Sequence, residues 1–400
     1  MLLQTGQLLS AAGSQTSAIA YPLLALGITG SAVAAGVVGF ARALPPALLA
    51  LPAGLAADRW NRRTLMIMAD VVRAAALATL AVAVVTGRAA VWSIALVAFV
   101  EGCGACLFSG AEVGALRAVV PAEQLPAAVA TQTGRRATVE LVGKPAGGAL
   151  FGVATALPFV VDAVSYAFST ASLLAVRTRF QEERAPDPSP LRRQLAEGFR
   201  FLWGHPFLRT SALIFGIGNF VGPGLLLTLL LVGERQKLSA LTLAVLVTAF
   251  AAALLVGSLL SPLVRRSLPV RAIFVLELWM WPVCAIFLLW PNAYVLALGL
   301  VPSALAIPST DSLVHGYRIA LTPDRILGRS EAVRSTISLL IAPLGPLVAG
   351  LLLDSTSPRR TVACFVAVAV GLAVWGTLSP ALREAPGATT TRSPAGDAGR

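Results

Sequence analysis

The stretch GLAADRWNRR, residues 54–63, gathers its charged side chains into six consecutive positions. They are Asp58, Arg59, Arg62 and Arg63. Only 12% of the 400 residues are charged, and the sequence on both sides of this stretch is almost pure Ala, Leu and Val. A soluble domain usually carries about 25% charged residues. A short charged connection between long apolar blocks is typical of a protein that crosses a membrane many times.

The apolar blocks predict twelve membrane-spanning helices, and hence an all-α membrane protein. Hydrophobic residues make up 56% of the chain. Breaking the sequence at Gly, Pro and charge clusters places the spans at 3–26, 32–54, 64–86, 91–115, 127–153, 156–176, 207–231, 240–264, 270–290, 293–316, 329–353 and 361–380.

The basic residues are concentrated on alternate connections. If both termini are cytoplasmic, the inside connections hold Arg59, Arg62, Arg63, Arg117, a group from Arg177 to Arg209, Arg265, Arg266, Arg271 and Arg325. The outside connections then hold only Arg88, Arg235, Lys237, Arg359 and Arg360. Because cytoplasmic loops carry the excess of Lys and Arg, we expect both termini inside, in the plasma (inner) membrane. The chain opens on an apolar run with no basic region before it, so we expect no cleavable signal peptide.

The longest connection, residues 177–206, separates six spans from six. It predicts an N-terminal half over 1–176, a cytoplasmic linker over 177–206, a C-terminal half over 207–380 and a disordered cytoplasmic tail over 381–400. Within the linker, Ser189-Pro190 indicates a helix start. The apolar residues after it share one face of that helix, as in a helix lying on a membrane surface: Leu191, Leu195, Phe199 and Leu202.

Three landmarks repeat in order at nearly one offset. Gly54 and Gly257 are 203 residues apart, and VPAEQL at 120 and TPDRIL at 322 are 202 apart. Gly143 and Gly148 in the fifth span match Gly345 and Gly350, again at 202. The repeat indicates duplication of a six-span unit. Two such units side by side predict a rocking-bundle transporter with its substrate site between the halves.

Several ionisable residues lie inside the predicted spans, where each would cost about 2.5–3.5 kcal/mol if left unpaired at the bilayer centre. Asp70 and Arg73 are three residues apart, and Glu140 is four residues from both Arg136 and Lys144, so these can pair within one helix. Others lie near the inner surface, where long side chains reach the interface: Arg117, His315 and Arg318.

Arg42, Glu101 and Asp162 have no such local partner. Arg42 is ~18 Å from the inner end of its span at the helical rise, and Glu101 lies at a similar depth, so we expect an Arg42–Glu101 pair across two helices. Burial favours the neutral form of a carboxyl group and an Arg partner favours the charged form. We therefore expect Glu101 to carry the coupling proton; the alternative is a static pair that fixes helix packing. Glu277 and Asp311 are candidates in the second half.

The opening stretch resembles the signature of the major facilitator superfamily, in the residues Gly54, Asp58, Arg59, Arg62 and Arg63. Residues 42–74 and EGFRFLWGHPFLR at 197–209 are similar to the branch containing enterobactin and macrolide exporters. The resemblance implies that the Asp-Arg cluster forms charge pairs between the halves and holds the inside gate shut. The alternative is that these arginines serve topology alone. That alternative does not explain Asp58, which reduces the positive charge.

The chain also departs from that family pattern. Ser261 stands where the second-half copy of Asp58 would fall. In AFVEGCGA, Ala98 takes the place of an Arg that the family ties to proton coupling, and Glu101 takes the place of a Gln. The fifth-span motif appears as GKPAGG with Lys144 at its first Pro, which leaves a helix-packing motif of Gly143, Pro145, Gly147 and Gly148.

These observations favour a secondary transporter. The chain has no G-x-x-x-x-G-K-[ST] loop for ATP, whereas the membrane potential supplies about 2.3 kcal/mol per charge per 100 mV. We expect a proton-coupled exporter, an antiporter with alternating access, for a drug-like compound, natural product or siderophore. The alternatives are a proton-coupled nutrient importer and a non-transporting sensor or scaffold.

Other classes of function lack their residues. No nucleophile triad or paired-carboxylate arrangement is present, and His205 and His315 are isolated, so we expect no enzyme. Cys103-Gly-Ala-Cys106 has neither a second pair nor a nearby His, so we expect no metal and no cofactor. The basic residues form no patch with interleaved aromatics, which argues against nucleic acid. The partners expected are a small-molecule substrate, protons and lipid, with one chain sufficient for transport.

Overall fold

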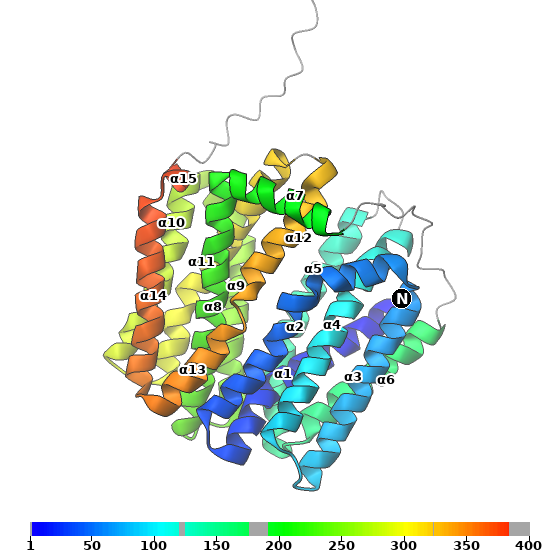
Figure 1. Cartoon of the computed structure of the whole chain (residues 1–400). Helices are drawn as coiled ribbons and strands as arrows, with labels where there is room; N and C mark the ends of the chain where they lie inside the picture. Colours follow the sequence, from blue (N-terminus) through cyan, green and yellow to red (C-terminus); the bar gives the residue numbers. More distant parts are fainter. Residues whose placement is uncertain (1, 120–124, 176–190, 323, 384–400) are drawn as a thin grey trace, which may run out of the picture.

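The computed structural model describes residues 2–119, 125–175, 191–322 and 324–383, and these residues are almost entirely helical (Figure 1). The first bundle comprises α1 (Leu2–Thr29), α2 (Ala32–Arg59), α3 (Arg62–Val85), α4 (Val91–Val119), α5 (Leu125–Val153) and α6 (Leu157–Ala175). Three predicted features fall outside the described residues: the connection that begins VPAEQL, the helix start at Ser189-Pro190, and most of the C-terminal tail.

A separate helix, α7 (Leu191–Gly204), precedes the second bundle. That bundle comprises α8 (Pro206–Arg235), α9 (Ala240–Ser267), α10 (Val270–Met280), the 3-10 helix η2 (Trp281–Leu288), α11 (Ala293–Leu321), α12 (Asp324–Leu340), α13 (Leu344–Ser355) and α14 (Pro358–Leu378), followed by the short α15 (Pro380–Arg383).

Within the described residues, ten of the twelve predicted spans correspond to helices that are long and apolar enough to cross a membrane. The other two are α1 and α5, helices of 28 and 29 residues. Gln, Ser and Thr lower the hydropathy of α1, and α5 carries the charges of Glu140, Lys144 and their neighbours. Both helices pack within the first bundle, so their polar residues lie against protein as well as lipid.

Two spans predicted as single helices are interrupted. The span predicted over 270–290 changes from α-helix to 3-10 helix at Trp281, with Pro282 next in the chain. The span predicted over 329–353 is broken between α12 and α13 at residues 341–343. Proline lacks the N–H that an α-helix needs and clashes with the preceding turn. Pro343 is the last residue of the second break, and Pro346 lies in the first turn of α13.

The helix starts follow local sequence signals. Ser31, Asn61, Ser239 and Ser357 accept hydrogen bonds at the first turns of α2, α3, α9 and α14. Each side chain satisfies a backbone N–H that has no partner inside the helix. Gly30 has a φ of 67°, a left-handed conformation that glycine adopts without strain. These signals fix the short turns between antiparallel neighbours.

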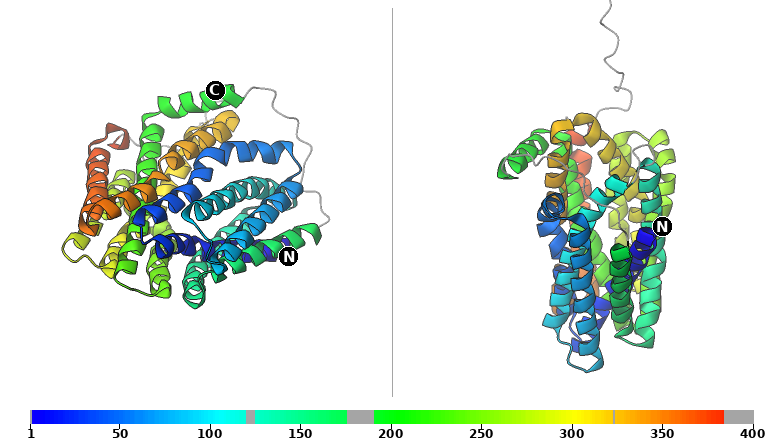
Figure 2. Two further views of the ribbon diagram at one scale, coloured as in Figure 1. Left: turned by 60° about the horizontal axis from the view of Figure 1, so that its bottom comes forward. Right: turned by 90° about the vertical axis from the view of Figure 1, so that its right-hand side faces the viewer.

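The two bundles stand side by side (Figures 1 and 2). In the first, α1 packs on α5 and α6, and α4 packs on α2 and α3; in the second, α9 packs on α11, and α8 packs on α13 and α14. The bundles meet chiefly through two pairs, α2 with α13 and α5 with α9. We call the end of the molecule that carries α7 the α7 end, and the opposite end, where α2 and α9 begin, the far end (Figure 1).

Helix α7 packs on α12 at the α7 end. Leu202 is fully buried, whereas Phe199 is 45% exposed and stacks on Trp203 with ring centroids 5.1 Å apart. The side chains of Leu191 and Leu195 lie outside the described residues. The end of α7 is thus anchored to the second bundle, and its aromatic residues remain available to a surrounding interface.

Candidate functional site

The two contacts between the bundles repeat at the predicted offset of 202. At Gly350 of α13, an added Cβ would lie 2.5 Å from the Ala32 carbonyl oxygen of α2. At Gly148 of α5, it would lie 2.5 Å from the Ala240 carbonyl oxygen of α9. Each contact therefore joins one bundle to the other through a glycine with no room for a side chain. We call these contacts the α2–α13 seam and the α5–α9 seam.

The same offset relates two contacts inside the bundles. A Cβ on Gly143 would meet the Gln15 side chain of α1, and one on Gly345 would meet the Phe220 carbonyl oxygen of α8. Gly147 also packs directly on the Thr16 backbone of α1. The residues of the GKPAGG motif thus face α1 on one side and the second bundle on the other. Close backbone approach is the physical reason for glycine at these positions.

The α2–α13 seam carries an additional polar contact at the far end. The Asp354 carboxylate of α13 accepts hydrogen bonds from Ser31 Oγ at 2.6 Å, Ala32 N at 2.8 Å and Val33 N at 3.0 Å. Arg235 of α8 lies 3.9 Å from Asp354 and donates to the Leu353 carbonyl oxygen. A carboxylate is stabilised at a helix N-terminus by the free N–H groups and the helix dipole. Asp354 therefore clamps α2 to the second bundle.

A cavity of about 470 Å³ lies between the bundles on the α7 side of both seams. Gly39 and Pro346, which touch at the inner edge of the α2–α13 seam, also line this cavity. The wall from the first bundle includes three ionisable groups: Arg42, Glu101 and Lys144. The wall from the second bundle is apolar: Pro223, Leu226, Leu227, Leu230, Val247 and Pro346. We call this space the central cavity.

The predicted cross-helix pair is present in that wall. Arg42 Nη2 of α2 lies 3.3 Å from Glu101 Oε1 of α4. The Arg42 side chain is 31% exposed, whereas the Glu101 side chain is 3% exposed and its Oε2 has no hydrogen-bond partner. Arg42 also donates to the Ser14 carbonyl oxygen and lies over the Tyr21 ring. The arginine faces the central cavity and the carboxylate lies behind it.

A second buried cation, Arg73 of α3, lies deeper in the same bundle. It pairs with Asp70 at 3.4 Å and donates to Ser14 Oγ and the Tyr166 hydroxyl oxygen. Its guanidinium lies 3.9 Å from the Tyr166 ring centroid. Ser14 therefore joins both arginines, since its carbonyl accepts from Arg42 and its hydroxyl from Arg73. The two predicted charge groups form one connected network.

Asp162 of α6 is fully buried beside this network. Its carboxylate accepts hydrogen bonds from Ser17 at 2.6 Å and from Ser165 at 3.3 Å. The sequence showed no local partner for Asp162, and the structure supplies one from α1. Within the described part of the chain, its hydrogen-bond partners are hydroxyl groups rather than cations.

Other predicted site residues lie apart from the central cavity. Glu140 pairs with Lys144 at 3.4 Å and lines a smaller polar pocket within the first bundle, together with Arg73 and Glu112. Glu277 of α10 is buried in the second bundle, and Asp311 of α11 is exposed. The structure brings Arg42 and Glu101 together and leaves the second-bundle carboxylates elsewhere.

The predicted gate is described only in part. The side chains of Asp58 and Arg59 lie outside the described residues. Arg63 donates to the carbonyl oxygens of Leu173 at 2.9 Å and Leu174 at 2.7 Å. These contacts join α3 to α6 within one bundle, so the visible contacts of Arg63 brace that bundle and do not cross to the other.

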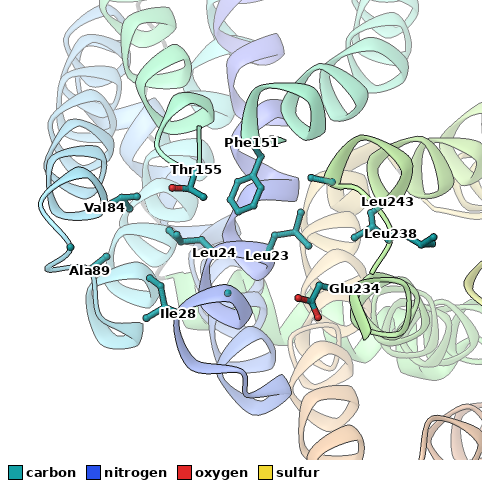
Figure 3. Close-up of a pocket in the computed structure, with 13 residues that line it drawn as sticks. Leu23, Leu24, Ile28, Val84, Ala89, Phe151, Thr155, Glu234, Leu238 and Leu243 are labelled. Atoms are coloured by element: carbon teal, nitrogen blue, oxygen red, sulfur yellow. The ribbon is translucent and has the colours of Figure 1, made fainter. Parts of the chain in front are cut away.

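A second cavity of about 430 Å³ lies at the far end, beyond the α5–α9 seam (Figure 3). Leu23 and Leu24 of α1, Phe151 of α5 and Leu243 of α9 line it, and the Glu234 carboxylate faces the same space (Figure 3). The α5–α9 seam thus separates this far-end pocket from the central cavity.

Sequence reasoning missed several of these residues. Ser14, Ser17 and Tyr166 lie among many similar residues in apolar helices, and only their contacts distinguish them. Asp354 offered a signal, because an acidic residue at a helix C-terminus is disfavoured by the helix dipole. Such a residue indicates a partner elsewhere in the fold.

Comparisons with known proteins agree with this architecture. The chain is 27% identical over 410 residues to the multidrug efflux pump Tap of Mycolicibacterium fortuitum, with 96% of each chain covered. A bacterial homologue of the human lysosomal transporter Spinster, solved inward-facing and unoccupied, has a TM-score of 0.73 at 16% identity, with 96% of each chain covered. The nucleoside transporter NupG has a TM-score of 0.71 at 12% identity, covering 94% of this chain and 97% of that chain.

These proteins are transporters, and the two solved structures show the shared fold. The family model described as transmembrane secretion effector matches residues 2–390. With nearly its whole length matched, the chain belongs to the transmembrane secretion effector family of the major facilitator superfamily.

Proposed function

We propose that this secondary transporter is a proton-coupled exporter of bulky amphipathic compounds: drug-like molecules, natural products or siderophores. The observation that carries the proposal is the central cavity, with the Arg42–Glu101 pair on one wall and apolar side chains on the other. Such walls suit a molecule with one polar group and a large apolar body. The multidrug efflux relative, aligned along nearly the whole chain, supports export.

The distribution of arginines supports a cytoplasmic α7 end with both termini inside. In that orientation the two seams close the outward side, and the central cavity is reached from the cytoplasm. Alternating access then requires residues 1–176 and 207–380 to rock as two units, with residues 177–206 as the linker. Opening the outward side breaks the Asp354 clamp and parts Gly148 from Ala240.

Glu101 is the coupling carboxylate in this proposal. With its proton absent, Glu101 is held by Arg42; with a proton on its free Oε2, that pairing weakens and Arg42 turns to the cavity. A substrate that contacts Arg42 and Glu101 thus competes with the proton for the same pair of side chains. The rival role is a static pair that fixes the packing of α2 on α4.

Asp58 and its neighbouring arginines form the cytoplasmic gate in this proposal, closing the inner side when the outer side opens. The far-end pocket beyond the α5–α9 seam (Figure 3) is the exit, with Glu234 as its polar group. One chain contains both cavities, so a monomer suffices.

The test is efflux of a fluorescent lipophilic dye from cells that express wild type, Glu101→Gln or Asp58→Asn, with and without a protonophore. Glu197→Gln is the matched control, because Glu197 lies on α7 and lines none of the cavities described here. We expect protonophore-sensitive efflux in wild type and the control. We expect at least a tenfold loss in Glu101→Gln, because it removes the proposed proton-transfer group. We also expect reduced efflux in Asp58→Asn, because it removes the carboxylate of the proposed gate.

Full activity in Glu101→Gln with intact protonophore sensitivity would remove Glu101 from coupling and leave the static pair. Accumulation of dye rather than efflux would favour a proton-coupled importer. If surface expression of a variant falls, efflux is normalised to the amount of protein in the membrane.

A further inference from the structure

The far-end pocket has walls from both bundles (Figure 3). Its volume of about 430 Å³ falls within the range of small-molecule sites, roughly 300–1,000 Å³. Leu23, Leu24 and Phe151 line it from the first bundle, and Leu238 and Leu243 line it from the second. A molecule bound in this pocket would therefore contact both bundles at once.

Glu234, near the end of α8, brings a negative charge to these apolar walls. Of the described residues that line the pocket, only Glu234 is charged, and its carboxylate faces the enclosed space (Figure 3). Glu234 is exposed, and an exposed carboxylate is ionised at neutral pH. Within the described part of the chain, its side chain makes no hydrogen bond or ion pair. The charge is thus available to a ligand.

The cations that are close to the pocket in sequence do not line it. Arg235 is engaged at the α2–α13 seam, where it lies 3.9 Å from Asp354. Arg88 and Lys237 are exposed neighbours of lining residues and are absent from the lining themselves. The described lining therefore carries a net negative charge.

The pocket also has unfilled space beside α1. A Cβ added to Gly27, which lines the pocket, would have no atom within 4 Å. The seam glycines Gly148 and Gly350 are the opposite case, because a Cβ there would meet a carbonyl oxygen. Glycine destabilises a helix relative to alanine, and close packing does not explain it at position 27. This glycine leaves volume that a ligand can occupy.

The walls and the charge together favour one kind of ligand. A molecule that fills the pocket removes water from Glu234. An anion would be repelled, and a neutral molecule would leave the carboxylate unpaired against apolar side chains, which is unfavourable. An organic cation pairs with the carboxylate while its apolar groups contact the leucines, and the Phe151 ring adds an attraction for the cation. A small hydrated ion would gain nothing from the apolar walls.

We propose that the far-end pocket is a binding site for one lipophilic monocation, such as a quaternary ammonium or phosphonium compound, with Glu234 as its counter-ion. The site is separate from the central cavity, since the α5–α9 seam lies between them. Because its walls come from both bundles, the bound cation holds the far end closed. That consequence rests on the alternating access proposed above, whereas the binding itself does not.

The test compares two ions of matched shape and opposite charge, tetraphenylphosphonium and tetraphenylborate. Each ion is titrated separately into purified full-length protein in dodecyl maltoside, a neutral detergent, and binding is measured by isothermal titration calorimetry. Protein-free micelles are the blank. We expect wild type to bind the phosphonium more tightly than the borate, because the two ions differ chiefly in the sign of their charge.

Two changes at Glu234 test the counter-ion. Glu234→Gln should weaken phosphonium binding about fivefold, the effect of losing one exposed charge pair. Glu234→Lys should reverse the preference, so that the borate binds more tightly than the phosphonium. Glu101→Gln is the charge control in the central cavity and should leave phosphonium binding at the far end unchanged.

A change at Gly27 tests the location of the site. Gly27→Leu places a side chain in the open space and should weaken binding of both ions at least tenfold, because the ligand and the new side chain overlap. Gly371→Leu is the matched control, since Gly371 also has open space around it and is absent from the lining. Gly350→Val, at the other seam, should weaken binding by opposing closure of the far end.

Equal affinities of wild type for the two ions would overturn the proposal. So would phosphonium binding that is unchanged in both Glu234→Gln and Gly27→Leu, and loss in Glu101→Gln would then place the ion in the central cavity. Unchanged binding in Gly350→Val would overturn the link to closure. Thermal unfolding and size-exclusion profiles show whether each variant is folded, and the exposed Glu234 carries the test if Gly27→Leu does not fold.

The binding test is independent of transport. A chain that binds the phosphonium at Glu234 but exports nothing would contradict the proposed function and leave this site intact. A chain that exports a dye but shows no effect of Glu234→Gln or Gly27→Leu on binding would keep the proposed function and lose the site.

Discussion

The two bundles have related backbones and opposite interiors. The first buries Glu101, Arg73, Asp70 and Asp162, and Arg42 beside them is 31% exposed. Ser14 joins the two arginines. The second supplies most of a large apolar cluster that also includes residues of α1 and α2, and Glu277 is its buried carboxylate among the described residues. A duplicated unit can therefore keep its packing while its two copies divide the work. In the proposed mechanism the charged copy responds to protons, and the apolar copy supplies the apolar wall of the central cavity.

The seams show the same asymmetry. Gly148 and Gly350 occupy equivalent places, but the residues four positions later differ: Asp354 follows Gly350, whereas Gly152 stands at the matching position after Gly148. An added Cβ at Gly152 would meet open space. The α2–α13 seam is therefore held by packing and a charged cap, and the α5–α9 seam by packing alone. The far-end pocket lies beside the weaker seam.

The largest effect is expected from Arg73→Leu in the charged interior. The change leaves the Asp70 carboxylate buried without its cation, which costs about 3–5 kcal/mol. Thermal unfolding of the purified protein in detergent measures the loss as a lower midpoint.

The control for that change is Lys144→Leu, because the Lys144–Glu140 pair is partly exposed and such pairs contribute about 0–1 kcal/mol. The double variant Asp70→Leu with Arg73→Leu should recover part of the loss, since an apolar pair removes the buried charge. Equal unfolding midpoints for Arg73→Leu and Lys144→Leu would mean that the buried network contributes no more to stability than a partly exposed pair.

An intermediate effect is expected from adding side chains to the seams. Gly350→Val and Gly148→Val each insert atoms where a carbonyl oxygen lies 2.5 Å from the Cβ position. Overpacking of this kind costs about 1–3 kcal/mol, and here it opposes closure of the far end. Cysteine cross-linking between the Ser31 and Asp354 positions, and between the Phe151 and Leu243 positions, would report closure of the two seams.

The repeat predicts similar losses of cross-linking at the two seams. Gly371→Val, on α14 with open space around it, is the matched control. A loss at one seam with none at the other would show that the duplicated glycines no longer have equivalent roles.

The smallest effect is expected from the charged cap. Asp354→Asn keeps the shape and removes the charge that faces the N-terminus of α2, a loss of about 0.3–1 kcal/mol for a charge at a helix end. The far end should open more often, measured as faster labelling of a cysteine at Leu24 in the far-end pocket. The complementary change Gly152→Asp adds an acid near the N-terminus of α9 and should slow that labelling. Faster labelling in both variants would contradict the cap as a clamp.

The sequence alone determined the class of the protein. Its apolar blocks are long enough to fix helices across a bilayer, and ten of the predicted spans pass the same test in the structure. The glycine repeat at offset 202 predicted a duplicated unit, and the structure places its glycines Gly148 and Gly350 at the two seams. Matching depth predicted the Arg42–Glu101 pair, since two unpaired charges at one depth have few other partners.

Only the tertiary structure decided which other residues make the polar contacts inside the first bundle and at the seams. Ser17 reaches Asp162 across 145 positions, and Asp354 reaches Ser31 across 323. Neither contact leaves a signal that identifies both partners, because a single hydrogen bond constrains two residues and no pattern around them. The helix breaks at Trp281 and between α12 and α13 were also not predicted from the sequence. Proline is tolerated in many of these helices, and packing against neighbouring helices determines where the helix is interrupted.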